Sequence, residues 1–210
     1  QALARLVGQG MAGAVVPKSE SPAQLAVIAE QAGAACALVA LVETVVGIDA
    51  LDALARAPQV QRLAFGHLDF QVDAGMQCDA DEAELLPIRM ALVMASRRAG
   101  MGQPVDGVTV ETKDAARMEG DARRALRMGF GGKLCIHPAQ VQPLHAVFDP
   151  DSAAVAHAQR LRQAMAEAGG GVCVLDGRMV DAPVITLARQ TLERQALGAT
   201  VDGVREMVAS

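Results

Sequence analysis

The sequence predicts a parallel α/β fold, and two observations carry that prediction. Short apolar runs alternate along the chain with longer stretches that carry helix signals, which is the strand–helix–strand rhythm of a parallel sheet. Most of the runs are nearly continuous in apolar residues, as expected for parallel strands that are covered on both faces. With 210 residues, the chain is long enough to bury most of its apolar surface.

Five apolar runs are predicted to be strands: 13–17, 37–42, 60–65, 105–110 and 132–136. The first three are closely spaced, so we expect short loops between them. A (β/α)8 barrel needs eight strands, and the chain opens on what reads as the tail of a helix. We therefore expect about three further strands to precede Gln1 in the intact protein.

The stretches between the runs are predicted to be helices. Ser21 begins a capping box and Gly33 closes that helix. Two apolar stripes follow helical spacing, and they are formed by Leu85, Ile88, Leu92 and Ala95 and by Ala154, Ala158, Leu161 and Met165. After Ile136 the chain is predicted to be helical, apart from a short run at 172–175. We divide it into an incomplete barrel, residues 1–148, and a C-terminal helical extension, residues 149–210.

The composition excludes several classes of partner. A net charge of −5, with four Phe and no Tyr or Trp, argues against a nucleic-acid surface. The chain has neither an apolar run of about 18 residues nor a signal pattern at its start, so no membrane partner is expected. The four cysteines are far apart and are predicted to be reduced core thiols. These features are typical of a cytoplasmic enzyme.

Two carboxylates follow neighbouring predicted strands. Glu43 comes directly after the second run, and Asp69 follows the third by four residues. In parallel α/β folds the carboxyl ends of strands gather the functional residues, and a hard divalent cation is bound by charged oxygens. Each residue has a structural alternative: Glu43 as a favourable charge at a helix beginning at Thr44, and Asp69 as a helix cap. Taken together at adjacent strand ends, they favour a metal site.

Four other polar residues have competing interpretations. His67 and His137 are interpreted as hydrogen-bonded structural residues more readily than as metal ligands. Lys18 either holds a phosphate or carboxylate or is a solvated loop end. Asp181 opens the last helix ahead of Pro183, which indicates a helix cap rather than a catalytic group.

Six ordered segments carry a resemblance to a known family: Val16–Ser21, Leu41–Thr44, Leu63–Asp69, Asp106–Val108, Gly129–Gln140 and Leu175–Pro183. On these segments the chain resembles the citrate lyase β-subunit-like branch of the HpcH/HpaI aldolase superfamily, the branch of citryl-CoA, malyl-CoA and citramalyl-CoA lyases. The resemblance runs from about Met11 to Arg194. The last two segments are the most specific to this branch.

The resemblance implies a (β/α)8 TIM barrel of the phosphoenolpyruvate/pyruvate type whose C-terminal helical extension packs on the next subunit, usually in a homotrimer. It also implies that Glu43 and Asp69 are the two magnesium ligands. The backbone amides around Gly66, His67 and Leu68 match the loop that holds the substrate carboxylate.

Two more segments gain roles from the resemblance. Ile136, His137 and Pro138 match a segment beside the coenzyme A channel. Asp181 matches an acidic residue that reaches into a neighbour's site for acid–base chemistry, so the resemblance changes its interpretation from a cap to a catalytic residue, with both roles compatible.

The implied activity is a Mg²⁺-dependent lyase that cleaves or forms a carbon–carbon bond between the enolate of acetyl-CoA and a small keto acid. The alternatives are a hydrolase of an acyl-CoA thioester at the same site, as in malyl-CoA thioesterases, and a non-catalytic coenzyme A-binding subunit. The family's catalytic arginine lies on strands ahead of Gln1, so this segment alone is expected to be inactive. Relatives often have small residues where His67 and Leu68 stand, so His67 is expected to crowd the keto-acid pocket or change its preference.

Overall fold

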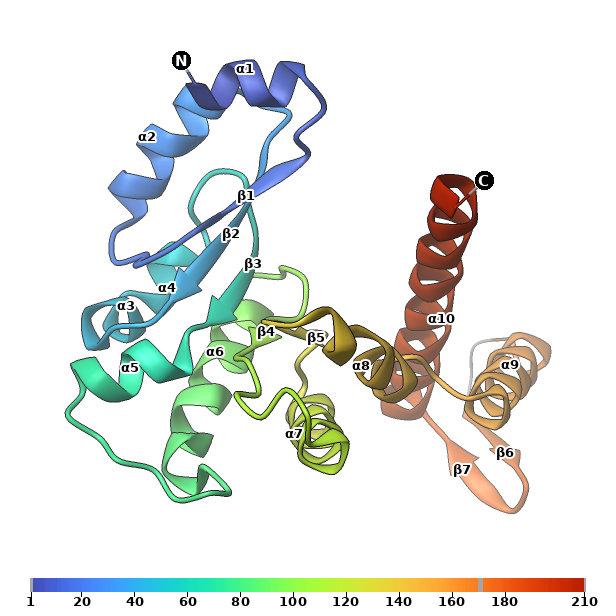
Figure 1. The fold of residues 1–210 in the computed structure, drawn as a ribbon. Helices are drawn as coiled ribbons and strands as arrows, with labels where there is room; N and C mark the ends of the chain where they lie inside the picture. The colour runs from blue at the N-terminus through green and yellow to red at the C-terminus, as the bar shows by residue number, and fades with distance from the viewer. Residues whose placement is uncertain (1, 170–171, 210) are drawn as a thin grey trace. The chain divides into compact units, whose positions relative to one another are not determined.

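The structure, a computed structural model, describes residues 2–169 and 172–209 (Figure 1). The chain forms two compact units, Gln1–Leu144 and His145–Ser210. The division falls within helix α8 (Val141–Phe148), the helix at whose end the sequence placed the boundary.

The first unit is built on a parallel sheet. Its strands are β1 (Gly13–Val16), β2 (Ala37–Val42), β3 (Val60–Phe65), β4 (Val105–Asp106) and β5 (Gly132–Lys133). They lie side by side in sequence order and every pairing is parallel, so the predicted parallel α/β fold is confirmed. The last two strands are shorter than predicted because the Gly107 and Val108 carbonyls accept hydrogen bonds from the Lys133 side chain rather than from a neighbouring strand.

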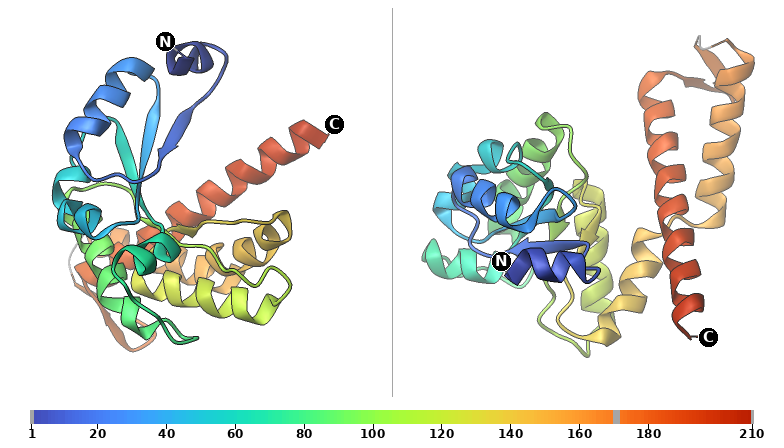
Figure 2. Two further views of the ribbon diagram at one scale, coloured as in Figure 1. Left: turned by 60° about the vertical axis from the view of Figure 1, so that its left-hand side comes forward. Right: turned by 90° about the horizontal axis from the view of Figure 1, so that it is seen from above.

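One helix of this unit precedes β1, and the others follow the strands in order. They are α1 (Ala2–Gly8), α2 (Pro22–Ala32), α3 (Val45–Asp49), α4 (Leu51–Leu54), α5 (His67–Asp73), α6 (Leu86–Arg98) and α7 (Ala115–Met128), with short 3₁₀ turns η1 (Ala83–Leu85) and η2 (Pro138–Gln140). Contacts join α2 to α4, α4 to α6 and α6 to α7. The helices therefore form a row that runs in the same order as the strands (Figure 2).

The helix signals in the sequence are largely confirmed. The Ser21 hydroxyl accepts a hydrogen bond from the Ala23 N–H at 3.2 Å, and Gly33 ends α2 with a φ of 84°. Leu92 and Ala95 of the predicted stripe on α6 are buried. The caps and spacing were therefore sufficient to place these helices.

The burial of β2 differs from the prediction. Leu38, Ala40 and Val42 are completely buried, whereas the residues between them are only half-buried. Alternate side chains of a strand point to opposite faces, so within the described chain one face of β2 is covered more fully than the other. A run of small and branched apolar residues does not reveal this difference.

The second unit contains a hairpin that the sequence analysis missed. Its elements are α9 (Ser152–Glu167), β6 (Cys173–Leu175), β7 (Arg178–Val180) and α10 (Ala182–Ala209), and β6 and β7 pair in antiparallel fashion. The turn residues Asp176 and Gly177 have φ values of 50° and 75°, as in the two-residue hairpin turns that favour Asp-Gly. Val180 packs with Ala158, Leu161 and Ala188 in the core of this unit.

Three of the four cysteines are less buried than the sequence predicted. Cys36 is buried, but Cys78 and Cys173 are partly exposed and Cys135 is exposed, so the expectation of core thiols is correct only for Cys36. All four cysteines are free. Among the described helices, none combines the length and apolarity needed to cross a membrane.

Candidate metal and substrate site

Glu43 lies at the carboxyl end of β2. Its side chain is buried, and its Oε1 accepts a hydrogen bond from the backbone N–H of Lys18 at 2.9 Å. Gly66, at the end of the neighbouring β3, leaves room for the carboxylate, because a Cβ there would lie 2.6 Å from Glu43 Oε2. Lys18 has a left-handed φ of 46°, which is a strained conformation for a residue with a side chain. The carboxylate is thus held between the ends of β1 and β3.

Asp69 belongs to the end of the adjacent strand. Val42 and Phe65 are paired residues of β2 and β3, and Asp69 lies in the first turn of the helix that follows Gly66. Its side chain is exposed, and within the described residues its carboxylate has neither a hydrogen bond nor an ion pair. Both predicted metal ligands therefore follow neighbouring strand ends, while the convergence of their oxygens on one cation stays a prediction.

Neither carboxylate acts as a helix cap. The Thr44 hydroxyl caps α3 by accepting from the Gly47 N–H at 3.1 Å, and the Val45 N–H donates to Asp73 Oδ2 at 2.8 Å. Helix α5 begins after a glycine, without a capping side chain. The cap interpretation of Asp69 is therefore wrong. Glu43 directly precedes the N-cap residue of α3, so the interpretation of its charge as favourable to that helix stays a prediction.

The carboxylates fit a hard cation that completes its coordination elsewhere. Glu43 Oε2 accepts no hydrogen bond from the described residues, and neither carboxylate oxygen of Asp69 accepts one. No group of three or more His, Cys, Asp or Glu side chains in residues 2–169 and 172–209 is arranged to hold a metal ion. Mg²⁺ is typically bound by one or two carboxylates together with water and substrate oxygens. The two carboxylates therefore suit an open Mg²⁺ site, in which water and substrate oxygens are further ligands, and not a site closed by protein ligands alone.

Of the three backbone amides predicted to hold the substrate carboxylate, one already has an acceptor within the protein. The Gly66 N–H donates to the Val42 carbonyl at 2.9 Å and is therefore occupied. The N–H groups of His67 and Leu68 are in the first turn of α5, where helix geometry supplies no acceptor, and none is found among the described residues. These two amides remain as anion donors.

The segment after β5 is fixed by a buried glutamine. Gln140 accepts from the Ile136 N–H at 2.9 Å and donates to the Thr109 carbonyl at 2.7 Å. His137 Nδ1 accepts from the backbone N–H two residues on, at 3.1 Å. His137 is therefore a hydrogen-bonded structural residue, while the side chain of Ile136 is exposed. Their predicted place beside coenzyme A stays a prediction.

In the second unit, Asp181 caps α10. Its Oδ1 accepts from the Val184 N–H at 3.3 Å, and its carbonyl accepts from the Ile185 N–H at 3.1 Å. The cap interpretation is therefore confirmed. The side chain is half-buried and lines a cavity together with Arg189, which is compatible with a second role.

A buried ion-pair network that the sequence did not predict consists of Glu82, Arg89, Asp106, Asp121 and Arg124. Arg89 is fully buried; its Nε lies 2.9 Å from Asp106 Oδ1 and its Nη2 lies 2.5 Å from Glu82 Oε2. A signal was present, because Arg89 lies four residues after Leu85 and three before Leu92, on the stripe that helical spacing buries.

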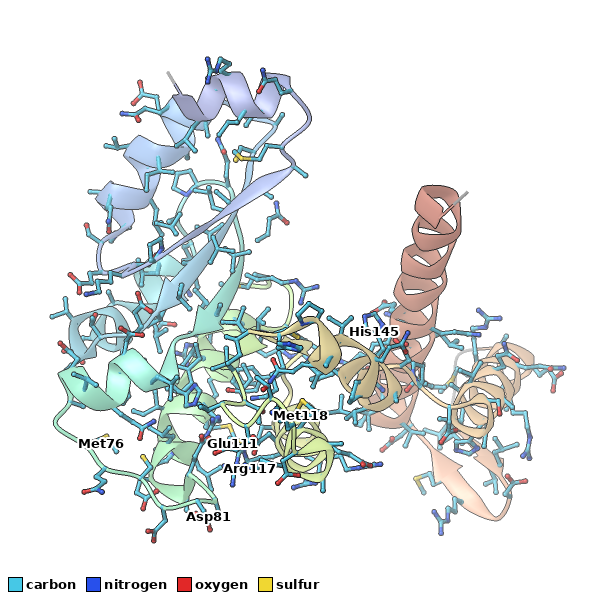
Figure 3. All side chains as sticks on the ribbon, in the orientation of Figure 1. Met76, Asp81, Glu111, Arg117, Met118 and His145 are labelled. Carbon is cyan, nitrogen blue, oxygen red and sulfur yellow. The ribbon has the colours of Figure 1, made fainter. Side chains whose placement is uncertain are left out.

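The network reaches α7 through Arg124, which contacts Glu82 Oε2 at 2.8 Å and Asp121 Oδ1 at 3.3 Å. Figure 3 labels Asp81, on the connection before α6, and Arg117, on α7, which belong to the two segments that the network joins. Burial alone would raise the pKa of Glu82, but its hydrogen bond with His67 and the charge of Arg89 lower that pKa well below its ordinary value.

The Lys133 side chain is also buried beneath the end of β4. Its Nζ donates to the carbonyls of Gly107 and Val108 and lies 4.0 Å from Asp106 Oδ2. Burial lowers the pKa of Lys133, although the charge of Asp106 opposes that shift. The lysine of the resemblance motif thus supports the loop after β4.

His67 is a buried, hydrogen-bonded residue, as the structural interpretation of its role predicted. Its side chain is only 2% exposed, and its Nε2 lies 3.3 Å from Glu82 Oε1. A Cβ at Gly107 would overlap His67 Nδ1. The ring is therefore buried against Gly107 and Glu82, and its predicted effect on the keto-acid pocket or its preference stays a prediction.

Gly107→Ala is expected to destabilise the protein by about 1–3 kcal/mol, because the added methyl forces the His67 ring out of its place. Urea unfolding measures this change. The double variant Gly107→Ala/His67→Ser is expected to recover most of the loss, and Gly120→Ala, where a Cβ meets nothing within 4 Å, serves as the control. Equal effects of the two glycine substitutions would contradict the assignment.

The sequence is similar to those of known proteins, as its six ordered family segments indicated. The profile of the HpcH/HpaI aldolase/citrate lyase family matches residues 1–138. A citrate lyase subunit beta-like protein of Deinococcus radiodurans is 33% identical over 89% of this chain. A (3S)-malyl-CoA thioesterase of Cereibacter sphaeroides is 33% identical over 74% of this chain. The chain spans 67% of the length of the first relative and 55% of the second.

A solved structure is also similar. The crystal structure of a CitE protein from Mycobacterium tuberculosis, in complex with magnesium, acetoacetate and coenzyme A, matches with a TM-score of 0.74 and 27% identity. The match covers 92% of this chain and 73% of that one. It therefore includes both units of the chain.

Proposed function

The chain belongs to the HpcH/HpaI aldolase/citrate lyase family, and from this premise we propose that it is the metal-binding part of a Mg²⁺-dependent CoA-ester lyase. The substrate is a citryl-CoA, malyl-CoA or citramalyl-CoA type thioester, which is split into acetyl-CoA and a small keto acid. The observation that carries the proposal is the pair Glu43 and Asp69, which follow neighbouring strand ends and are not used as helix caps.

The relatives support the chemistry of this site. One similar structure was obtained with magnesium, a keto acid and coenzyme A, which are the three components that the proposal requires. The singly wound strand order is the order of consecutive strands in a (β/α)8 barrel. We propose that the first unit is an arc of such a barrel in the intact protein, which assembles as a homotrimer.

Each residue of the site has a defined task in this proposal. Glu43 and Asp69 hold the cation, which supplies Lewis-acid polarisation of substrate oxygens when it is bound. The amides of His67 and Leu68 bind the carboxylate of the keto-acid part. The Ile136–Pro138 segment lies along coenzyme A.

The proton inventory assigns a task to Asp181. Cleavage breaks the bond between the acetyl carbon and the carbinol carbon, the carbinol loses its proton to become the keto acid, and the enolate of acetyl-CoA takes up one proton. We propose that Asp181 of a neighbouring subunit carries out one of these transfers, because a carboxyl group within hydrogen-bond reach is a competent acid–base catalyst.

Substitution of Asp181 separates its two roles. Asp181→Asn keeps a good N-cap residue and removes the acid–base group, so we expect turnover to fall by about 10²–10⁴-fold with little change in Tm. Asp181→Ala is expected to lose the same activity and about 1 kcal/mol of stability as well. Steady-state kinetics and thermal unfolding measure the two effects. An active Asp181→Asn protein would contradict the catalytic role.

Product analysis tests the function itself. The purified intact protein is incubated with malyl-, citramalyl- and citryl-CoA, with Mg²⁺ and with EDTA. The lyase releases a keto acid together with acetyl-CoA only when Mg²⁺ is present. If none of the three thioesters is turned over in a metal-dependent way, the lyase proposal is contradicted and a coenzyme A-binding subunit becomes the better description.

A thioesterase is the second candidate, and the Cereibacter relative favours it, because that protein is a (3S)-malyl-CoA thioesterase with 33% identity. The same incubation distinguishes the two activities. A hydrolase releases free coenzyme A with an intact hydroxy acid, whereas a lyase releases a keto acid. Both reactions require the same thioester to bind, so the site residues are shared.

A further inference from the structure

Glu82, in the connection before α6, has an unusual backbone and several partners. Its φ and ψ are 54° and 37°, a left-handed conformation that long side chains rarely adopt. Its Oε2 accepts hydrogen bonds from Arg89 and Arg124, while its Oε1 faces His67 Nε2. Strain of this kind persists only where the surroundings impose it. The two arginines thus fix the carboxylate in front of His67.

His67 has little freedom to move. Its ring is packed against Gly107 and lies 6.2 Å from the Phe65 ring, measured between centroids. Its carbonyl accepts a hydrogen bond from the Gln71 side chain at 3.2 Å. The place of the ring therefore sets the place of the backbone at residue 67.

That backbone connects the two metal-ligand positions. His67 directly follows Gly66, whose lack of a side chain admits the Glu43 carboxylate, and Asp69 lies two residues later on the same helical turn. A shift of the backbone at residue 67 moves Gly66 against Glu43 and also moves the Asp69 carboxylate. The buried ion-pair network is thereby linked to the metal site through one ring.

We propose that Glu82 is a positioning residue that, through His67, sets the geometry of the 66–69 segment beside Glu43. The inference rests on the proposed function, because it takes Glu43 and Asp69 as the ligands of one cation. Some residues do not bind the metal but contact and orient its ligands. Their removal typically lowers metal affinity by about 10–100-fold. Glu82 acts on Asp69 indirectly, because it contacts His67 and not Asp69 itself.

The direct test is the affinity for Mg²⁺, measured by calorimetry. Glu82→Asn suits the left-handed backbone, since Asn is enriched in that conformation, but the shorter, uncharged side chain cannot hold His67. We expect its Kd for Mg²⁺ to rise by about 10–100-fold. The control is Asp121→Asn, which removes a buried carboxylate of the same network that contacts Thr109, Arg117 and Arg124 but not His67.

Asp121→Asn is expected to lower Tm while leaving the Kd for Mg²⁺ unchanged. A wild-type Kd in Glu82→Asn, or an equal rise in both variants, would overturn the positioning role. His67→Ser keeps the Glu82–Arg89 pair and provides a second test if Glu82→Asn fails to fold. If Glu82 acts through His67, the double variant Glu82→Asn/His67→Ser loses no more affinity for Mg²⁺ than the single variant with the larger loss. Additive losses of affinity would overturn the proposal.

Amide hydrogen exchange without metal separates this inference from the proposed function. We expect the hydrogen-bonded amides of Gly66 and Phe70 to exchange faster in Glu82→Asn than in Asp121→Asn, because local opening follows loss of the His67 contact. Equal exchange rates would refute the positioning role. If the wild-type protein binds no Mg²⁺, the metal site fails, and the exchange rates still decide whether Glu82 orders this segment.

Discussion

Glu43→Gln is expected to abolish Mg²⁺-dependent turnover, lowering kcat/KM by at least about 10²–10³-fold, because metal catalysis contributes several kcal/mol of transition-state stabilisation. The substitution keeps the size of the side chain. Its amide oxygen still accepts the Lys18 N–H that Glu43 Oε1 accepts at 2.9 Å. The fold and the strand end should therefore remain, so the loss isolates the charge that binds the cation. Thioester cleavage at varied Mg²⁺ concentration measures it.

Asp73→Asn is the matched control for Glu43→Gln. Asp73 lies on the same helix as Asp69, and its carboxylate accepts the Val45 N–H at 2.8 Å, so it is a neighbouring carboxylate with a structural task. Its amide retains that hydrogen bond, and turnover should stay at the wild-type level. A Glu43→Gln protein that keeps the wild-type response to Mg²⁺, or a control that loses it equally, would show that Glu43 is not a ligand.

Arg89→Met is expected to lower the free energy of unfolding by about 3–5 kcal/mol, because it leaves the buried carboxylates of Asp106 and Glu82 without their main counter-charge. Arg89 is completely buried and its ion pairs are 2.9 and 2.5 Å long. Its guanidinium also lies 5.8 Å from the centre of the Phe65 ring. Urea unfolding, followed by circular dichroism, measures the loss.

Arg123→Met provides the comparison for Arg89→Met. Arg123 pairs with Glu119 on the surface of α7, where both side chains are at least half exposed. Exposed pairs contribute about 0–1 kcal/mol, so this variant should unfold close to the wild type. Equal costs for the two substitutions would mean that Arg89 is not the counter-charge of a buried network.

Local signals in the sequence were sufficient for much of the fold. The caps at Ser21 and Gly33 placed α2, and the nearly continuous apolar runs placed β2 and β3 at their observed bounds. The hairpin of the second unit was missed because three-residue strands carry too little periodicity, although the Asp176-Gly177 pair was a usable turn signal. The short β4 and β5 depend on side-chain hydrogen bonds from Lys133, which no pattern in the sequence reveals.

The site was predictable only in part. Strand ends identified Glu43 and Asp69, and the family segments distinguished a metal ligand from a helix cap. The occupied N–H of Gly66 depends on pairing with Val42, and the place of His67 depends on Glu82, fifteen positions along the chain. Such contacts are set by tertiary structure, so the sequence indicated a hydrogen-bonded structural role for His67 but not the partner that holds its ring.

One measurement tests the central claim that Glu43 and Asp69 share a cation. Crystals of the protein grown with Mn²⁺ in place of Mg²⁺ reveal the ion by its anomalous scattering. We predict a peak whose first ligands include a carboxylate oxygen from each residue, at distances near those of a Mg²⁺-like ion, about 2.0–2.1 Å. A peak bound by only one of the two residues, or found only elsewhere in the fold, would contradict the claim.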